Sequence, residues 1–328
     1  MGNDTGVSEG SPHVLIIALR TLFLILCAFL TIGGNILSIL VLNRLKSMSE
    51  VPKIFLLSLA FTDLCMGLLN DLFSIIPGIT SSWPYGDAFC KVIGISGSIF
   101  CGVSLLSLMS VSVDRYIAIS KPLHYIQLVT RPRALCVVTT IWISTCILVT
   151  LSSILKGDGS VIYNPRLCTC MVAWGDTEFK TFNLITLFAF IMVPAIGMLL
   201  LYIRLFFISR RHIRKITEVS TGNPPVISRH ERKAIKTLFI VTGAFNVAWL
   251  PFLIAHSYLA ISGKVIDDRL LFFVLWLAIS NSWWNVLIYS VTNRAYRNTA
   301  SAFLISLLPG SRNIVQRFNG DPEDTNTN

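Results

Sequence analysis

Apolar residues dominate seven long stretches of the chain, and shorter polar segments separate these stretches. A helix needs about 20 predominantly apolar residues to cross the hydrocarbon core of a bilayer, and every stretch reaches that length. The pattern therefore predicts seven membrane-spanning helices. They are expected at residues 14–42, 53–79, 88–120, 134–155, 179–208, 233–261 and 266–291.

Composition supports this interpretation and argues against a nucleic-acid partner. Hydrophobic residues make up 53% of the chain, charged residues only 13%, and the mean hydropathy is +0.69, whereas about a quarter of the residues in a soluble domain are charged. The net charge of +10 would suit nucleic-acid binding, but the basic residues fall between the apolar stretches. The predicted fold class is an all-α membrane protein, a seven-transmembrane helix bundle with a short amphipathic cytoplasmic helix.

Basic residues gather on alternate connections between the predicted spans. One set of connections holds Arg44, Arg131 and Arg210 among many others, whereas the other set holds few, such as Lys156 and Lys264. Lysine and arginine accumulate on the cytoplasmic side of membrane proteins. The sequence therefore predicts a multi-pass protein with an extracellular N-terminus and a cytoplasmic C-terminus.

The two ends of the chain lie outside the predicted bundle of residues 14–291. Residues 1–13 are polar and contain the sequon Asn3-Asp4-Thr5, which makes Asn3 a candidate for glycosylation in an extracellular segment. Residues 292–308 are amphipathic and are expected to lie as a helix in the cytoplasmic interface of the membrane. Residues 309–328 are polar and are predicted to be disordered.

Polar side chains inside the predicted spans carry the most information, because a charge at the bilayer centre costs about 2.5–3.5 kcal/mol on insertion scales. Asp63 lies near the middle of the second span. It is interpreted either as hydrogen-bonded glue between helices or as a cation site in the bundle core, and its position alone favours neither. Asp71 lies two turns further toward the outer end of the same span.

Helical spacing places several of these polar residues on shared faces. Ser104 and Arg115 are eleven residues apart, which is about three turns plus 20°, so both lie on one face of the third span. Asn281, Asn285 and Tyr289 are four residues apart in turn and share one face of the seventh span. Each pattern predicts a polar face inside the bundle.

Aromatic residues and prolines mark the sixth and fifth spans. Phe245, Trp249 and Phe252 lie along one side of the sixth span, a pattern that is more often core packing than a ligand site. Pro251 follows Trp249 closely, and Pro194 lies within the fifth span. Both prolines remove a backbone hydrogen bond and bend a helix, which predicts cavities and pivots at these points.

Taken together, these residues resemble the rhodopsin-like (class A) G-protein-coupled receptors over residues 14–308. The resemblance consists of one marker in each span, in the family's order. The markers are Gly34-Asn35, Leu59-Ala60-Phe61-Thr62-Asp63, Cys90 with Asp114-Arg115-Tyr116, Trp142, Pro194 with Tyr202, Trp249-Leu250-Pro251, and Asn285-Val286-Leu287-Ile288-Tyr289. Shorter matches place the chain nearest the amine-receptor and melatonin-receptor branches.

The resemblance implies a receptor of the plasma membrane that converts binding of an extracellular small ligand into G-protein activation. In such receptors, outward movement of the sixth span frees Arg115, which Asp114 and Glu231 hold at rest, to contact the G protein. Tyr202 and Tyr289 then stabilise the open form, and Pro122 and Leu123 dock on the G protein. The implied coupling and switch residues are Asp114, Arg115, Tyr116, Glu231, Tyr202, Tyr289, Pro122 and Leu123.

The resemblance also implies an ion site and a disulfide. Its sodium pocket corresponds to Asp63, Ser104, Asn281 and Asn285, and the implied metal ligand is Asp63; no other cofactor is expected. Cys90 is expected to pair with a cysteine of the second outer loop. Cys170 is preferred to Cys168, because the apolar residues that follow Cys170 can dip toward the ligand pocket.

Two absences narrow the class of ligand that the resemblance allows. Gly97 stands where amine receptors have an aspartate, and Ile279 stands where opsins have a retinal-binding lysine, so neither an ordinary amine nor retinal is expected. Asp71 is interpreted either as a cation partner facing the pocket or as a solvated residue near the outer end. The predicted ligand pocket comprises Asp71, Gly97, Ser98, Cys101, Thr186, Phe190, Trp249, Phe252 and His256.

The remaining expectations concern partners and rival functions. The expected partners are a heterotrimeric G protein, arrestin, a receptor kinase, the small extracellular ligand and membrane lipid. An orphan receptor that signals without a required ligand is the alternative, and a membrane transporter is less favoured because no inverted repeat is visible. Val286 replaces the proline of the seventh-span motif, which predicts a straighter helix. No HExxH or GxSxG motif indicates an enzyme.

Overall fold

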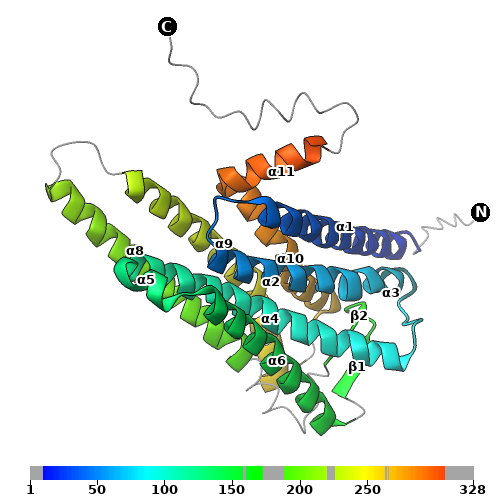
Figure 1. Cartoon of the computed structure of the whole chain (residues 1–328). Helices are drawn as coiled ribbons and strands as arrows, with labels where there is room; N and C mark the ends of the chain where they lie inside the picture. The colour runs from blue at the N-terminus through cyan, green and yellow to red at the C-terminus, as the bar shows by residue number, and fades with distance from the viewer. Residues whose placement is uncertain are drawn as a thin grey trace, which may run out of the picture.

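The computed structural model describes residues 10–157, 160–172, 188–219, 226–262, 264 and 266–306. Long helices lie side by side in an elongated bundle, with a small β-hairpin at one end and a short helix across the other (Figure 1). The elements are α1 (Gly10–Arg44), α2 (Glu50–Met66), η1 (Gly67–Asp71), η2 (Leu72–Ser74), α3 (Ile75–Thr80), α4 (Asp87–Ser120), α5 (Pro122–Leu128), α6 (Arg131–Lys156), β1 (Val161–Asn164), β2 (Thr169–Val172), η4 (Phe188–Met192), α8 (Val193–Val219), α9 (Val226–Ser262), α10 (Asp268–Thr292) and α11 (Arg294–Ser306).

The predicted number of membrane spans is confirmed. Six helices of the described chain are long and apolar enough to cross a membrane, and the apolar part of α8, Val193–Leu205, adds the next. The second span combines α2, η1, η2 and α3 into one rod, Glu50–Thr80. Residues 179–187 of the predicted fifth span lie outside the described residues. The fold is a seven-helix membrane bundle.

The outer surface of the bundle is apolar, as a lipid-facing surface must be. In the most apolar stretch of α6 only 11% of the residues are buried inside the protein, and Ile154 on this helix is 68% exposed. On α1, Phe29 is 72% exposed. Soluble proteins rarely expose large apolar patches, and the many exposed large hydrophobic side chains of these helices are those expected of a surface that membrane hydrocarbon covers.

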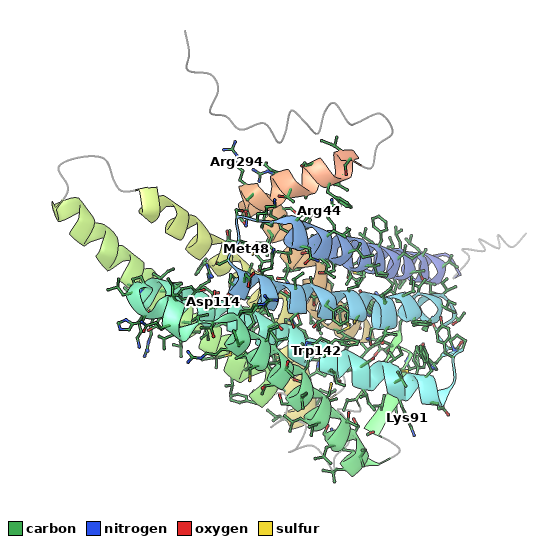
Figure 2. All side chains as sticks on the ribbon, viewed as in Figure 1. Arg44, Met48, Lys91, Asp114, Trp142 and Arg294 are labelled. Atoms are coloured by element: carbon green, nitrogen blue, oxygen red, sulfur yellow. A yellow bond between two sulfur atoms is a disulfide. The ribbon has the colours of Figure 1, made fainter. Side chains whose placement is uncertain are left out.

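Helix α4 runs through the bundle and contacts α2, α6, α8 and the hairpin. Its neighbours are joined by polar contacts as well as apolar ones: Trp142 Nε1 on α6 donates to Ser58 Oγ on α2 at 3.2 Å, and Ser58 in turn bonds Ser107 on α4. Trp142 lies at the face of α6 that meets the bundle (Figure 2). The fourth-span tryptophan therefore ties three helices together.

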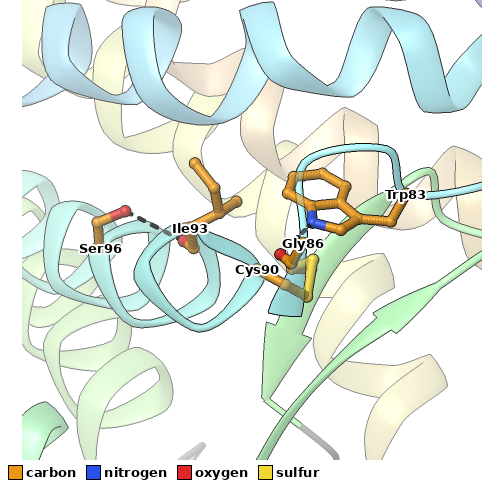
Figure 3. The surroundings of a disulfide bond; sticks show 6 residues. Trp83, Gly86, Cys90, Ile93 and Ser96 are labelled. Carbon is orange, nitrogen blue, oxygen red and sulfur yellow. Dashed lines mark hydrogen bonds between the residues drawn. A yellow bond between two sulfur atoms is a disulfide. The ribbon is translucent and has the colours of Figure 1, made fainter. Parts of the chain in front are cut away.

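The β-hairpin is fixed to the start of α4 by a disulfide between Cys90 and Cys170, whose Cα atoms are 5.3 Å apart (Figure 3). Strands β1 and β2 pair antiparallel, with Val161 opposite Val172. Beside the disulfide, Trp83 Nε1 donates to the carbonyl of Gly86 at 2.9 Å. The preference for Cys170 over Cys168 is confirmed. We call this end of the bundle the hairpin end.

The opposite end, which we call the α11 end, carries α5 and α11 (Figures 1 and 2). Helix α11 turns away from α10 at Asn293 and packs on α1: Tyr296 is buried against Val41, and the Arg44 guanidinium lies 4.3 Å from the centre of the Phe303 ring. Residues 307–308 of the predicted amphipathic helix lie outside the described part of the chain, as does the tail from residue 309. Helix α10 continues through Val286 to Thr292 without a break.

Candidate functional site

A small cavity, lined by both polar and apolar side chains, lies in the middle of the bundle, between α2, α4, α9 and α10. Its volume of about 10 Å³ is room for one water-sized molecule. Asp63 and Ser104 lie at its wall, opposite Asn281 on α10 and Trp249 on α9. A cavity of this size with a carboxylate in its wall suits an ion or a water rather than a small organic molecule.

Asp63 is the polar centre of this cavity and is only 1% exposed. Its Oδ1 accepts a hydrogen bond from Ser104 Oγ at 3.1 Å, and its Oδ2 accepts one from Asn285 Nδ2 at 3.4 Å. No ion pair among the described residues neutralises this carboxylate. The structure therefore brings the four predicted pocket residues, Asn281 included, to one place around a buried acid.

Ser282, which the sequence analysis did not single out, completes this region together with the first-span marker Asn35. Ser282 lines the cavity, and its carbonyl accepts a hydrogen bond from Asn35 Nδ2 at 3.0 Å, which ties α1 to α10. Buried carboxylate, hydroxyl and amide oxygens of this kind are the ligands that hard cations prefer. The residues present thus fit a small cation bound at Asp63.

An aromatic ladder on α9 leads from the cavity toward the hairpin end. Trp249 stacks on Phe245 with ring centres 6.0 Å apart, and its ring meets Phe252 edge-on at 5.7 Å. The ring centres of Phe252 and His256 are 3.9 Å apart. The indole Nε1 of Trp249 is buried and has no hydrogen-bond partner among the described residues.

The structure does not gather the predicted ligand wall into one cavity. Cys101 and Trp249 line the cavity beside Asp63, but the open side of Gly97 is filled, because a Cβ added there would lie 2.7 Å from Asn70 Oδ1. The hydroxyl of Ser98 donates to the carbonyl of Gly94 on its own helix. Asp71 is fully buried and does not line the cavity.

Two further residues of the predicted wall yield no side-chain geometry. Phe190 lies in η4, but its side chain is outside the described part of the protein, and Thr186 lies in the segment 173–187, which is also outside it. The wall on the side of the fifth span therefore stays a prediction.

The turn of the hairpin inserts into the bundle above the aromatic ladder, which the sequence analysis did not foresee. Leu167 is 2% exposed and packs in one apolar cluster with Phe252 of α9 and Leu271 of α10. Its carbonyl accepts a hydrogen bond from Trp276 Nε1 at 3.0 Å. Leu167 thereby joins the hairpin turn to the apolar cluster at the hairpin end of the ladder.

At the α11 end, the predicted switch arginine is held by its neighbour. Arg115 Nε donates to Asp114 Oδ2 at 2.7 Å, and the hydroxyl of Tyr125 on α5 donates to Asp114 Oδ1 at the same distance. Asp114 lies at this end of α4 (Figure 2) and is 2% exposed. Burial, as the main cause, and the nearby Asp114 carboxylate, as the second, raise the pKa of Tyr125 to about 12. Tyr125 is therefore a neutral hydrogen-bond donor at physiological pH.

The two predicted tyrosines lie between Asp63 and Arg115. Tyr202 on α8 is hydrogen-bonded to Ser112 on α4, with 2.7 Å between the two hydroxyl oxygens. The hydroxyl of Tyr289 on α10 is buried without a hydrogen-bond partner among the described residues, and its ring lies 6.2 Å from that of Tyr296. Each tyrosine thus faces the interior at the level between the cavity and the α11 end.

The remaining predicted coupling residues either lie at the α11 end or have side chains outside the described part of the protein. Pro122 begins α5, and Leu123 beside it is 88% exposed. Tyr116 lies beside Arg115 on α4 and packs partly buried against the main core cluster. Glu231 is in α9, but its side chain lies outside the described part, so its predicted pairing with Arg115 stays a prediction.

Fold and site together define a multi-pass helical membrane protein whose buried polar groups connect a central cavity with one exposed end. The sequence profile described as "7 transmembrane receptor (rhodopsin family)" matches residues 34–289. The chain therefore belongs to the rhodopsin-like (class A) family of G-protein-coupled receptors, which is a family of receptors and not of enzymes.

Curated relatives and a solved structure agree with this assignment. The chain is 31% identical to the histamine H2 receptor of Homo sapiens over 281 residues, which cover 84% of this chain and 77% of that receptor. It is 31% identical to the G-protein coupled receptor 52 of Mus musculus, over 85% of this chain and 78% of that one. The octopamine receptor beta-1R of Drosophila melanogaster is 27% identical, over 98% and 68% of the two chains.

The crystal structure of squid rhodopsin superposes with a TM-score of 0.78 and 20% sequence identity, covering 95% of this chain and 93% of that one. At this identity the match supports the fold alone.

Proposed function

We propose that this receptor converts binding of an extracellular small ligand at the hairpin end into activation of a heterotrimeric G protein at the α11 end. In this proposal the protein resides in the plasma membrane, with the N-terminus outside and the C-terminus inside. The observation that supports it is the series of buried and half-buried polar groups that runs from Asp63 past Tyr289 and Tyr202 to Arg115. Burying a polar group costs folding free energy, so polar groups inside the bundle between the cavity and the α11 end are expected to have a function.

Outward movement of α9 is the proposed activation step. Pro251 lies inside α9 and leaves the carbonyl of a residue one turn earlier without its helical partner, which makes this point a pivot. Trp249 lies at this level and lines the cavity. A ligand that shifts the aromatic ladder would thus swing the α11 end of α9 away from α4 and free Arg115.

Distances between spin labels test this movement. Labels on Val137 of α6 and Phe239 of α9, both exposed, are expected to separate by several ångströms when nucleotide-free G protein is added to the purified receptor. The exposed Cys136 is replaced by serine in this background, and a pair on Val137 and Phe29 of α1 serves as the control. Unchanged label distances with the G protein bound would contradict the proposed movement.

We propose that a sodium ion binds at Asp63 with Ser104, Asn281 and Asn285 and stabilises the resting receptor. The ion would supply the positive charge that the buried carboxylate lacks among the described residues. Closure of the cavity around it would oppose the movement of α9, since Trp249 and Phe245 belong to the same wall.

The proposed ligand is small and largely uncharged. Histamine and octopamine, which two relatives are named for, are amines, and an amine needs a carboxylate in its pocket. Here Gly97 supplies none, and Asn70 occupies the space beside it. The wall that remains is aromatic, with Trp249, Phe252 and His256, which suits an apolar ligand with a few hydrogen-bonding groups.

Signalling without a required ligand is the second candidate function, and the inserted hairpin favours it. Leu167 and Phe252 belong to one buried apolar cluster, so a residue of the protein's own loop packs with the aromatic ladder on which a ligand would press. Trp276 holds the loop there through its hydrogen bond to the Leu167 carbonyl. In this case the hairpin itself acts as the agonist.

Replacing Leu167 with alanine separates the two candidates. If the loop acts as the agonist, basal second-messenger production in cells is expected to fall severalfold, because the cluster that joins the loop to Phe252 loses the Leu167 side chain. Ile162→Ala is the matched control, since Ile162 lies on the same hairpin but is 49% exposed. An unchanged or raised basal signal at equal surface expression would rule out the loop as agonist and favour an external ligand.

We also propose arrestin, a receptor kinase and membrane lipid as partners at the α11 end. Helix α11 begins at Arg294 and contacts α1 and α10, and Arg44 of α1 lies beside it (Figure 2). Such an amphipathic helix with basic residues suits the interface of the cytoplasmic leaflet, where anionic lipid headgroups lie.

A further inference from the structure

Asp71 is a second fully buried acid in the second span, and it stands apart from the cavity at Asp63. Its exposed fraction is 0%, and neither carboxylate oxygen has a hydrogen-bond partner among the described residues. No ion pair of the described part involves it. An ionised carboxylate in such surroundings is costly unless a partner compensates it, and native structures rarely leave buried polar atoms unsatisfied.

The π-helical turn η1 directs the Asp71 side chain toward the interior of the bundle. In a regular α-helix, the side chains of two residues eight apart point in directions that differ by about 80° around the helix axis. The π turn η1 contains one residue more than an α-helical turn, which reduces this angle between Asp63 and Asp71 to about 20°. Asp63 and Asp71 therefore share one face of the rod. Both acids lie within electrostatic reach of Cys101 on α4, so they belong to one polar region of the bundle.

Helix α1 presses closely on this turn. A Cβ on Gly67, the first residue of η1, would lie 2.8 Å from Ile32 Cγ1 and 3.0 Å from Thr31 Cγ2. Thr31 and Cys27, one turn apart on α1, both lie close to Asp71. Thr31 makes no hydrogen bond of acceptable geometry through its buried hydroxyl.

Helix α10 contributes the third side. Trp283 lies next to Cys27, and its indole Nε1 is buried without a hydrogen-bond partner among the described residues. The junction of α1, η1 and α10 thus holds two carboxylate oxygens, a hydroxyl oxygen and an indole N–H, none of which makes a hydrogen bond of ordinary geometry to a described residue, although Thr31 lies beside Asp71 and Trp283 beside Cys27. The oxygens could ligate an ion, and the N–H could donate to a water bound to that ion.

We propose that Asp71 and Thr31 bind a hydrated monovalent cation, of the chemical class of sodium, at a site separate from the Asp63 pocket. Oxygen ligands select a hard cation. One carboxylate balances one positive charge, and no group of three or more His, Cys, Asp or Glu side chains that could hold a metal occurs in the described part, which disfavours a divalent ion. An organic amine is excluded by the complete burial of Asp71 away from the central cavity.

Thermal unfolding of the full-length receptor in lipid nanodiscs tests this site. The unfolding temperature is measured in sodium chloride and in N-methyl-D-glucamine chloride at equal ionic strength. In the Asp63→Asn variant, sodium at about ten times its dissociation constant is expected to raise this temperature by about 2–4 °C. In the Asp63→Asn, Asp71→Asn double variant, that rise is expected to disappear.

Two further variants keep the test sharp if the double variant does not fold. Thr31→Val removes one oxygen ligand but keeps the acid, and in the Asp63→Asn background it is expected to raise the half-maximal sodium concentration severalfold. Thr145→Val is the matched control, because Thr145 is also a buried threonine whose hydroxyl lacks a partner, on α6. It is expected to leave the sodium response unchanged.

The outcomes for the two acids are distinguishable. If Asp63→Asn alone abolishes the whole sodium response, the site at Asp71 does not exist. If Asp63→Asn responds like the unmodified receptor while Asp71→Asn does not, the pocket proposed at Asp63 fails and the site at Asp71 stands. An unfolding temperature of Asp63→Asn that depends on pH but not on sodium would show that Asp71 carries a proton, which would overturn the proposal.

Discussion

Replacing Arg115 with alanine is expected to abolish G-protein activation while the receptor still folds and reaches the cell surface. The Arg115 side chain is 24% exposed at the α11 end, and its described hydrogen bonds go to Asp114 and Tyr125, which are close to it in the same region. Its loss therefore removes little packing. Basal and stimulated second-messenger production, normalised to surface expression, are expected to fall to the level of cells without the receptor.

The opposite effect is expected from Asp114→Asn. This change removes the charge that holds Arg115 but keeps an acceptor for the Tyr125 hydroxyl. A charge-assisted bond is about twice as strong as a neutral one, so Arg115 is released more often and basal signalling rises. Loss at Arg115 together with gain at Asp114 would not follow from a purely structural role of this pair.

Arg131→Ala is the matched control for Arg115→Ala. Arg131 is another arginine near the α11 end, and it forms an exposed ion pair with Glu50 at 3.7 Å. Exposed pairs of this kind contribute between about 0 and 1 kcal/mol. Wild-type signalling by Arg115→Ala would contradict coupling through that residue, and an equal loss in Arg131→Ala would indicate a general effect of charge at this end.

Physical rules of the bilayer made most of the bundle predictable. Each span must be a long apolar helix, because lipid offers no hydrogen bonds to the backbone. A long run of apolar residues in the sequence is therefore enough to predict a span. The contact between Ser104 and Asp63 was predicted from the resemblance, since both residues recur at fixed places in the family's helices. The structure puts them 3.1 Å apart.

Features that depend on tertiary packing escaped the sequence analysis. The π turn at Gly67–Asp71 changes the face on which Asp71 lies. Gly67, against which α1 packs, is the one local sign of this turn, and a glycine alone does not predict it. Asp71 was predicted either to face the ligand pocket as a cation partner or to be solvated near the outer end of its span, and its complete burial away from the cavity contradicts both. The structure places it against α1 instead.

Loops escaped for a related reason. The insertion of Leu167 depends on the hairpin register and on the position of Trp276, which is 109 residues further along the chain. Tyr125 was overlooked because it follows the third span by a few residues and belongs to a connection. Its hydrogen bond to Asp114 could have been suspected, because a buried carboxylate needs donors and Tyr125 carries a hydroxyl donor in the connection that follows the third span.

Cys170→Ser is expected to reduce folded receptor at the cell surface to a small fraction. The disulfide spans 80 residues, and closing a loop of that size restricts the unfolded chain by about 4–5 kcal/mol in the chain-entropy description. Without it, the hairpin has only two strands, which are marginally stable alone. Surface expression and the unfolding temperature of the purified protein measure the loss.

Cys168→Ser is the matched control, because Cys168 is two residues away and is a free, fully buried cysteine. It packs with Leu24 and Trp276 and has a φ of 57°. It therefore sits in the turn, on the side of the hairpin that meets α1 and α10, whereas Cys170 meets α4. The serine variant is expected to keep the disulfide and to lose only the packing of one sulfur atom.

This difference in position also predicts that Cys168 does not replace Cys170. Pairing Cys168 with Cys90 would pull the turn toward α4 and withdraw Leu167 from its cluster with Phe252, at the cost of the hydrogen bond from Trp276. Peptide mapping of the Cys170→Ser variant under non-reducing conditions decides the matter. A Cys90–Cys168 bond in well-expressed receptor would show that the hairpin tolerates a shifted register, and the fixed insertion of Leu167 would then be wrong.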